Sequence, residues 1–521
     1  MPVTITPQML QQVSDPALAQ SGFSSAESAV TFVSPGPTSP AAVVAEWTDA
    51  RDNFAIAYLP SGAVTFSRCS RRTCGLGGGA VATAMDQATT LDVPCPTGSC
   101  PLGEACVSGM CVLPNFSGDP AVAGATNPSG SASGIVVALN LGLSISGMHP
   151  SGSDAVVAVA SFGGGRPSTW GRTQAETVIV NEGTGDCDVG GAPSLALPAS
   201  PITDRPRISF DPFLSTASSA TFWIAWTGPN DSLCVRSVTA SAGVLTRGPS
   251  VPPMPGVTMH NGSFVIRSHL DFVYVMWSEL LPGGCDRFAV TWHIRRSHDG
   301  GATWDTPHVV WSAPRYRGCF GVIPDPNFTS PCTNDASCPQ VPVRDSCFAQ
   351  ICGRPLTDGW SSFDFDIDQP SGTFWAVVHD SANQARVLRS VVEDGATWST
   401  DYVVPSSLPV GQLALIVAPS GNVGVSMYRQ VAGSPPQVQR WIAARDELTN
   451  TWSLPVPISP VFAPTATAAG GSVAGIGEYQ GLAAIDPFQF GGSSFFPVWT
   501  EIDPTDTNLY RIEGRGVAVT P

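Results

Sequence analysis

The sequence predicts an all-β fold: a β-propeller of four-stranded blades, with seven blades favoured over six. Three observations support this prediction: the composition, an internal repeat and a hairpin motif. Glycine (53) and proline (48) make up about a fifth of the 521 residues, and the apolar residues come in short clusters between turn-forming residues. This pattern favours many short strands.

The repeat is a β-rich cluster that ends in an aromatic residue followed by a small or acidic one, with weaker copies at His379 and Tyr428 and a seventh copy, at Leu139, that has no aromatic. Its anchors are Trp47, Leu139, Trp226, Trp277, His379, Tyr428 and Trp499, which lie 92, 87, 51, 102, 49 and 71 residues apart. A unit of about 50 residues is typical of a propeller blade, because one small sheet cannot bury both of its faces alone. We expect each anchor in the second strand of its blade. Recurring aromatic strands in a β-sandwich are the alternative.

The two longest gaps between anchors each contain a compact group of cysteines. Removing about 45 residues from each gap restores a spacing near 50, so the cysteine groups are interpreted as insertions in the repeat. The expected organisation is an N-terminal segment (1–24), a single propeller (25–519) and two cysteine-rich insertions within it (69–114 and 315–356).

The 14 cysteines favour disulfides over metal binding, because the two groups lack the C-x₂-C pairs of zinc sites. We expect two disulfides within each group, Cys95, Cys100, Cys106, Cys111 and Cys332, Cys338, Cys347, Cys352. The simplest remaining pairs are Cys69 with Cys74, Cys187 with Cys234 and Cys285 with Cys319. Disulfides predict a secreted or surface-exposed protein, although residues 1–5 show no signal peptide.

Composition excludes several classes of function. All 25 basic residues are arginine, so no P-loop or lysine Schiff base is possible. The net charge of −16 argues against nucleic acid or an anionic membrane as the main partner. No run of about 18 apolar residues predicts a membrane span. No metal site or cofactor is expected.

A complete hairpin motif, S-x-D-x-G-x-T-W, occupies residues 297–304, with degenerate copies at 394–398 and 450–453. Its fixed residues are Ser297, Asp299, Gly301, Thr303 and Trp304. This motif resembles the Asp-box (BNR repeat) of sialidase-like propellers, including uncharacterised secreted bacterial proteins. The resemblance covers roughly residues 25–519 outside the insertions. It implies a structural role for Asp299 rather than a catalytic one.

Ligands of propellers usually bind near the axis, where the innermost strands begin. The candidate catalytic residues there are Arg205, Arg207, Arg267, Asp364 with Asp366, Glu478 and Tyr479. A sialidase needs three arginines, a tyrosine–glutamate couple and an acid/base aspartate. The sequence departs from this pattern: residues 26–29 read Ala-Glu-Ser-Ala where the family has its first arginine. Glu478 and Tyr479 are adjacent, so a strand would point them to opposite faces.

Three functions follow from these residues. The first is an extracellular propeller that binds a glycan or another surface ligand without catalysis. The second is a glycoside hydrolase of the exo-sialidase type. The third is a structural or cargo component of an extracellular assembly, with protein partners bound through the cysteine-rich insertions.

Overall fold

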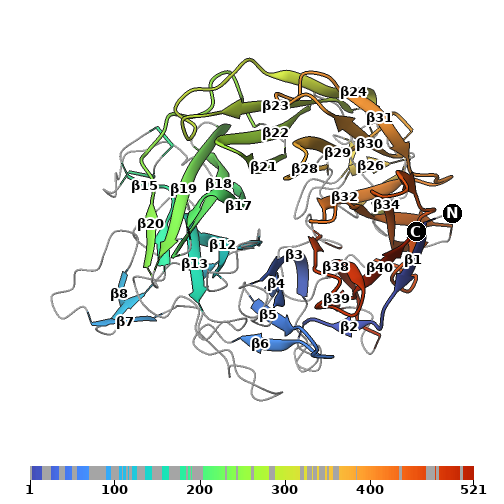
Figure 1. The fold of residues 1–521 in the computed structure, drawn as a ribbon, viewed down its shortest axis with the longest axis horizontal. Helices are drawn as coiled ribbons and strands as arrows, with labels where there is room; N and C mark the ends of the chain where they lie inside the picture. The colour runs from blue at the N-terminus through green and yellow to red at the C-terminus, as the bar shows by residue number, and fades with distance from the viewer. Residues whose placement is uncertain are drawn as a thin grey trace.

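The structure is a computed structural model, and it confirms the all-β propeller prediction. It describes residues 3–14, 25–34, 41–49, 55–69, 90–94, 105–107, 110–112, 115–116, 120–125, 135–143, 155–162, 177–183, 186–187, 189–190, 204–216, 218–228, 231–241, 244–259, 263–280, 288–316, 322–324, 331, 337–338, 346–348, 351–355, 363–382, 384–432, 437–464, 476, 480–504 and 509–521. In these ranges, seven sheets of four or more strands surround a central axis (Figure 1).

Each sheet is a blade whose first strand lies nearest the axis. The first blade contains β3 (Ser25–Val33), β4 (Ala42–Asp49), β5 (Ala55–Pro60) and β6 (Ser67–Cys69). The second contains β11 (Ala121–Gly124), β12 (Ile135–Leu143), β13 (Ala155–Phe162) and β14 (Thr177–Ile179), with β10 (Asn115–Phe116) beside β12. The third contains β17 (Asp204–Thr216), β18 (Ser219–Gly228), β19 (Ser232–Ser241) and β20 (Val244–Arg247).

The next three blades follow the same antiparallel order. The fourth contains β21 (Phe264–His269), β22 (Phe272–Leu280), β23 (Phe288–Ser297) and β24 (His308–Tyr316). The fifth contains β28 (Asp364–Asp368), β29 (Thr373–His379), β30 (Ala385–Ser390) and β31 (Ser399–Val403). The sixth contains β32 (Val410–Val417), β33 (Val423–Val431), β34 (Gln437–Asp446) and β35 (Thr451–Trp452), with β36 (Val456–Pro457) beside β34.

The seventh blade joins the two ends of the chain. It contains β37 (Leu482–Ala484), β38 (Ser493–Ile502), β39 (Tyr510–Gly514) and β40 (Val517–Thr520), and its outer strand is supplied by β1 (Thr4–Pro7) and β2 (Gln11–Gln12). The first strand of every blade contacts the first strand of the next, and β37 contacts β3. The ring is therefore closed, and N-terminal residues help to close it.

The seven anchors lie in the second strand of their blades, as the repeat predicts, and all are buried. Trp226 is fully buried with Leu139 in one apolar cluster shared by the second and third blades. Trp499 packs with Tyr428 between the sixth and seventh blades. Because every blade buries both faces against neighbours, the ring shares its core among all blades.

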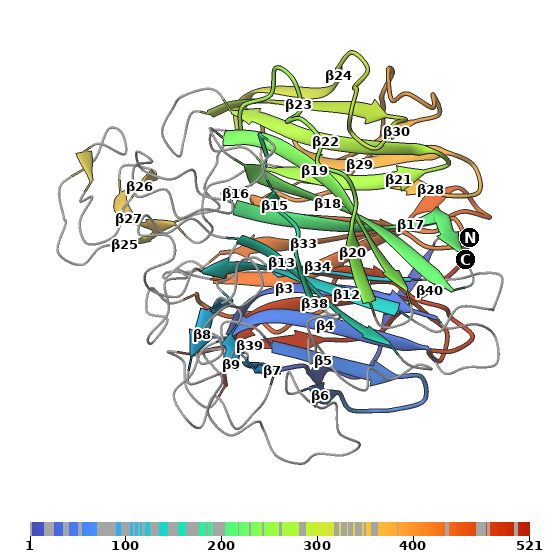
Figure 2. The same cartoon turned by 90° about the vertical axis from the view of Figure 1, so that its left-hand side faces the viewer.

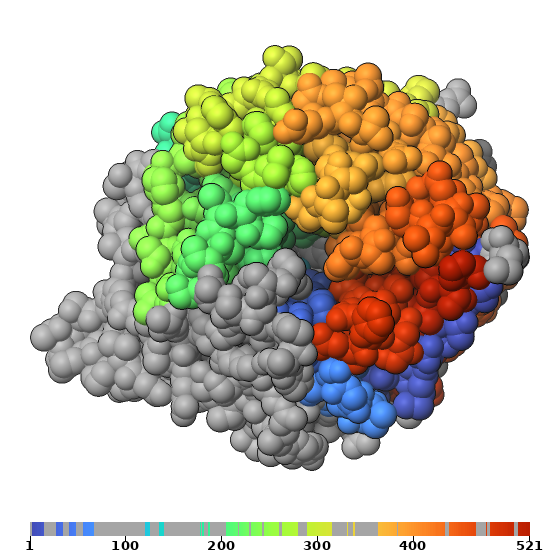
Figure 3. Space-filling view, viewed as in Figure 1, coloured from blue at the N-terminus to red at the C-terminus, as the bar shows by residue number. Residues whose placement is uncertain are grey.

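Strand direction gives the disc two different faces. The hairpins between first and second strands and between third and fourth strands form one face, here called the hairpin face, which is seen in Figures 1 and 3. The opposite face, where the inner strands begin, is called the strand-start face. Figure 3 shows a small hollow at the centre of the ring on the hairpin face.

Both cysteine-rich insertions follow a fourth strand, so they leave the ring at the strand-start face. The first carries a three-stranded sheet of β7 (Thr90–Pro94), β8 (Ala105–Val107) and β9 (Met110–Val112). The second carries β25 (Val322–Pro324), β26 (Ser346–Phe348) and β27 (Ile351–Pro355), which project beyond the ring in Figure 2. A two-stranded sheet, β15 (Glu182–Gly183) and β16 (Val189–Gly190), lies between the second and third blades in sequence.

Cysteine positions are described only in part. A disulfide joins Cys187 to Cys234 on β19, with the two Cα atoms 5.8 Å apart, as the sequence suggested. Cys106 is the cross-strand partner of Cys111, and Cys347 is that of Cys352. Cys338 is disulfide-bonded. The other positions of the predicted pairs lie outside the described residues, or their side chains do, so those pairs stay predictions.

Candidate functional site

The hairpin motif forms a tight turn between β23 and β24, on the hairpin face. Asp299 accepts hydrogen bonds from the Thr303 amide (2.8 Å) and hydroxyl (2.6 Å), and these bonds lower its pKa to about 2. The Ser297 hydroxyl accepts a bond from the Gly301 amide (2.8 Å), and Gly301 has a φ of 96°. Asp299 is thus fully engaged in its own turn, away from the face where the inner strands begin.

Five of the seven predicted catalytic residues lie on inner strands. Arg205 and Arg207 are near the start of β17, Arg267 is on β21, and Asp364 and Asp366 are on β28. The structure brings Arg267, Asp364 and Asp366 together. Glu478 and Tyr479 lie outside the described residues, between Ile476 and Gln480.

Arg267 is shared between two carboxylates of the next blade. Its Nη2 donates to Asp364 Oδ1 (3.1 Å) and its Nε to Asp366 Oδ1 (3.1 Å). Both aspartates face the arginine because residues i and i+2 of a strand point to the same side. The three side chains are between 11% and 19% exposed. The third nitrogen, Nη1, donates to the carbonyl of Ile266 (2.8 Å).

The remaining carboxylate oxygens are held by the blade after that. Asp364 Oδ2 accepts the Leu415 amide (3.0 Å), and Asp366 Oδ2 accepts the Val417 amide (2.8 Å), both from β32. These amides belong to the inner edge of the sixth blade, where no further strand of the described ranges pairs with them. The cluster therefore links three consecutive blades at the axis, and it satisfies backbone donors that would otherwise face the channel.

Burial makes these aspartates harder to ionise. Desolvation raises the pKa of Asp364 to about 6, against the opposing effects of Arg267 and the Leu415 amide. The pKa of Asp366 is raised for the same reason. The neighbouring charge of Asp366 adds to the raised pKa of Asp364, because one arginine neutralises only one of the two charges.

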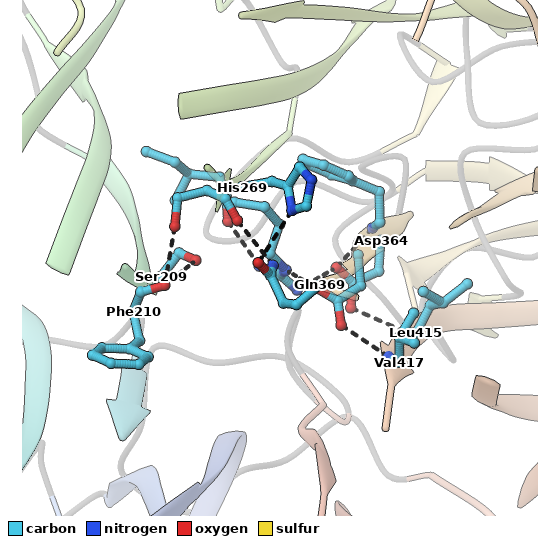
Figure 4. Close-up of polar contacts among 12 residues, drawn as sticks. Ser209, Phe210, His269, Asp364, Gln369, Leu415 and Val417 are labelled. Atoms are coloured by element: carbon cyan, nitrogen blue, oxygen red, sulfur yellow. Dashed lines mark hydrogen bonds and ion pairs between the residues drawn. The ribbon is translucent and has the colours of Figure 1, made fainter. Parts of the chain in front are cut away.

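The links continue around the ring toward the third blade (Figure 4). The Ser268 hydroxyl donates to the carbonyl of Phe210 (3.1 Å) on β17. The Gln369 amide donates to the carbonyl of Ser268 (2.9 Å), and Gln369 Oε1 lies 3.3 Å from His269 Nδ1. Four inner strands are therefore joined by one series of polar contacts, at the centre of which lies the axial cluster of Arg267, Asp364 and Asp366.

The strand-start face has a different geometry. The pairing of an inner strand with its neighbour is interrupted near its start in β3, β17 and β32. Arg205 (φ 54°) and Gln412 (φ 48°) take left-handed backbone conformations at two of these irregularities. Such conformations cost about 1–3 kcal/mol and concentrate at functional sites. The side chains of Arg205 and Gln412 are both largely buried.

Sequence reasoning missed how the predicted residues are used. Asp364 and Asp366 were recognisable as a same-face pair, but their donors are backbone amides, which carry no sequence signal. A second ionic cluster was also missed. Arg511 contacts Glu501 (2.8 Å) and Glu513 (2.7 Å) on adjacent strands of the seventh blade. The alternation Arg511-x-Glu513 could have indicated that these two side chains share a face.

Two negative findings concern the described residues. They contain no group of three or more His, Cys, Asp or Glu side chains placed to hold a metal ion. They also contain no helix that is long and apolar enough to cross a membrane.

Comparisons with known proteins give only distant similarities. No family model and no curated protein matches the chain. A protein of unknown function from Dyadobacter fermentans is 10% identical, with 99% of each chain covered and a TM-score of 0.38. A lectin from Aleuria aurantia is 10% identical (77% of this chain, 95% of the lectin, TM-score 0.36). A Trypanosoma rangeli sialidase mutant is also 10% identical (84% and 60%, TM-score 0.36).

Proposed function

We propose that the protein is an extracellular propeller that binds a glycan or another surface ligand at its strand-start face, without catalytic turnover. The observation that carries the proposal is the engagement of Arg267 with Asp364 and Asp366. An arginine that clamps a substrate carboxylate must present free donors, and an acid/base aspartate must reach the leaving group. Here all four carboxylate oxygens have partners, and Arg267 spends three of its five N–H donors, one from each nitrogen, on bonds within the protein.

The position of the insertions supports the choice of face. Both cysteine-rich insertions leave the ring where the inner strands begin, and the irregular starts of β3, β17 and β32 lie on the same side. Ligand sites are commonly built from irregular segments carried by a rigid scaffold. In this proposal, the irregular starts of these inner strands, with buried Arg205 on β17, shape the rim, and the insertions enlarge the binding surface.

One observation favours hydrolysis as the second candidate. The raised pKa of Asp364, about 6, suits a general acid near neutral pH. Hydrolysis requires Asp364 to exchange the Leu415 amide or Arg267 for the substrate, which breaks the contact between blades.

A glycan array tests the proposal directly. Purified protein is applied beside the Arg205→Ala and Tyr479→Phe variants, and the same samples are assayed with a fluorogenic sialoside. Arg296→Ala is the matched control, because Arg296 lies at the hairpin end of β23 and pairs with Asp305 (2.7 Å). We expect glycan binding that weakens about tenfold in Arg205→Ala, because the substitution removes a buried side chain from the irregular start of β17, which forms the rim in this proposal.

Two results contradict the proposal. Turnover that is lost in Arg205→Ala or Tyr479→Phe but kept in Arg296→Ala means that the protein is a hydrolase. Absence of both binding and turnover favours the structural role in an extracellular assembly instead.

A further inference from the structure

The hairpin face carries an excess of exposed apolar side chains. The described residues expose thirteen large apolar side chains, and nine of them lie in or beside hairpins of this face. They come from six of the seven blades, so the apolar tips surround the axis rather than forming one groove. The most exposed are Phe488 (99%), Leu448 (89%) and Val64 (66%).

Phe488 is held rigidly in this exposed position. Its amide donates to Asp486 Oδ1 (3.0 Å) within the turn between β37 and β38. The next residue fastens the turn to the first blade, because Gln489 Oε1 accepts the Ala41 amide (3.0 Å) and its carbonyl accepts the Ser61 hydroxyl (2.5 Å). A fully exposed aromatic on such a pinned turn loses little conformational entropy when it docks.

Leu270 is exposed in an unfavourable conformation. It is 42% exposed in the turn between β21 and β22, with a φ of 54°. Asparagine or glycine suits this left-handed conformation better than leucine does. Folding alone does not favour an exposed leucine there, so the residue points to a function outside the fold.

Carboxylates stand beside the apolar tips. Asp271 follows Leu270 and Glu393 follows Val392, and both residues are exposed, whereas exposed Glu447, which precedes Leu448, pairs with Arg445. Combined with the net charge of −16, this pattern disfavours anionic lipid. It complements the quaternary ammonium of a choline headgroup, which both carboxylates and aromatic rings attract.

We infer that the hairpin face docks on a zwitterionic, choline-headgroup lipid surface. Phe488, Val64 and Leu270 enter the interfacial layer, while the adjacent carboxylates meet the ammonium groups. The apolar tips form a broad ring on one side of a disc, which fits a flat surface better than a single protruding partner. This site lies on the face opposite the proposed glycan site and is independent of it.

Flotation of the full chain with phosphatidylcholine vesicles tests the inference, because these vesicles carry no glycan. We expect binding that decreases about tenfold in Phe488→Ser and about threefold in Leu270→Asn. Val461→Asn is the matched control: Val461 is 43% exposed but precedes Phe462, which pairs with Val438 near the start of β34. Leu270→Asn should remain folded, because asparagine tolerates the left-handed conformation.

Several outcomes overturn the inference. They are absence of binding to phosphatidylcholine vesicles, stronger binding once anionic phosphatidylglycerol is added, or an equal loss in Val461→Asn. Self-association of the protein that Phe488→Ser and Leu270→Asn abolish assigns the face to a second copy of the chain instead.

Discussion

Two clusters in this propeller each share one arginine between two carboxylates, yet they are held differently. In the axial cluster, Asp364 and Asp366 accept Arg267 on one side and backbone amides of the next blade on the other. In the seventh blade, Arg511 lies between Glu501 and Glu513, and the indole of Trp499 donates to Glu501 (3.0 Å).

The contrast appears in the pKa values of the carboxylates. Burial raises the pKa of Glu513 to about 8, with Arg511 opposing the shift and Glu501 adding to it, whereas the pKa of Asp364 rises only to about 6. A backbone amide donates to Asp364 and lowers its pKa, and such a bond favours the ionised form. The comparison teaches that backbone donors, in addition to the paired cation, decide how readily a buried carboxylate in this fold ionises.

The largest expected effect comes from removing each arginine. Arg267→Met leaves Asp364 and Asp366 without their cation, and we expect the free energy of unfolding at neutral pH to fall by about 3–5 kcal/mol. Arg511→Met should cost less, about 2–3 kcal/mol, because Glu513 escapes the penalty by protonation. Chemical denaturation measures both.

Arg296→Met is the control for these two variants, because Arg296 pairs with Asp305, whose side chain is 58% exposed. We expect a loss below about 1 kcal/mol for this surface pair. A cost for Arg267→Met no greater than that of Arg296→Met means that the axial cluster does not hold the blades together.

A smaller effect concerns the pH dependence of stability. Since the pKa of Glu513 is raised from 4.5 to about 8 on folding, the folded state retains a proton that the unfolded chain loses. The stabilisation that the protonated Glu513 gives the folded state is fully present below pH 4.5 and is lost as the pH rises through about 8. Glu513→Gln should remove this slope, which is at most about 1.4 kcal/mol per pH unit.

Asp364→Asn should change the free energy of unfolding over a lower and narrower pH range, between pH 3.8 and about 6. As with Glu513, the stabilisation from the retained proton is lost as the pH rises through this range. Denaturation series across pH separate the two variants. If both variants change the same window, backbone amides do not distinguish the two clusters.

The smallest effect is that of the indole donor. Trp499→Phe removes the hydrogen bond to Glu501 and should cost about 1–2 kcal/mol more than Trp47→Phe. Trp47 is the buried anchor of the first blade, so the two variants lose a similar apolar volume. Thermal unfolding compares them, and equal costs mean that the indole bond adds nothing to the seventh blade.

The sequence was informative wherever structure is local or periodic. The anchors lie in second strands because their spacing follows the blade, and the Asp299 turn follows from residues within one hairpin. The axial cluster joins residues 97 and 99 positions apart, and its amide donors are 51 positions from their acceptors. Such contacts depend on the closure of the ring, which a linear pattern does not encode. The outer strand of the seventh blade, supplied by residues 4–12, was missed for the same reason.

The measurement that tests the central claim most directly is the rate of sialoside hydrolysis as a function of pH. Because Asp364 is engaged by Arg267 and the Leu415 amide, the account predicts no turnover above the blank at any pH between about 4 and 8. A rate that declines above the pKa of Asp364, about 6, and that is abolished in Asp364→Asn but kept in Arg296→Met, contradicts it. That result identifies Asp364 as a working acid and the axial cluster as a catalytic site.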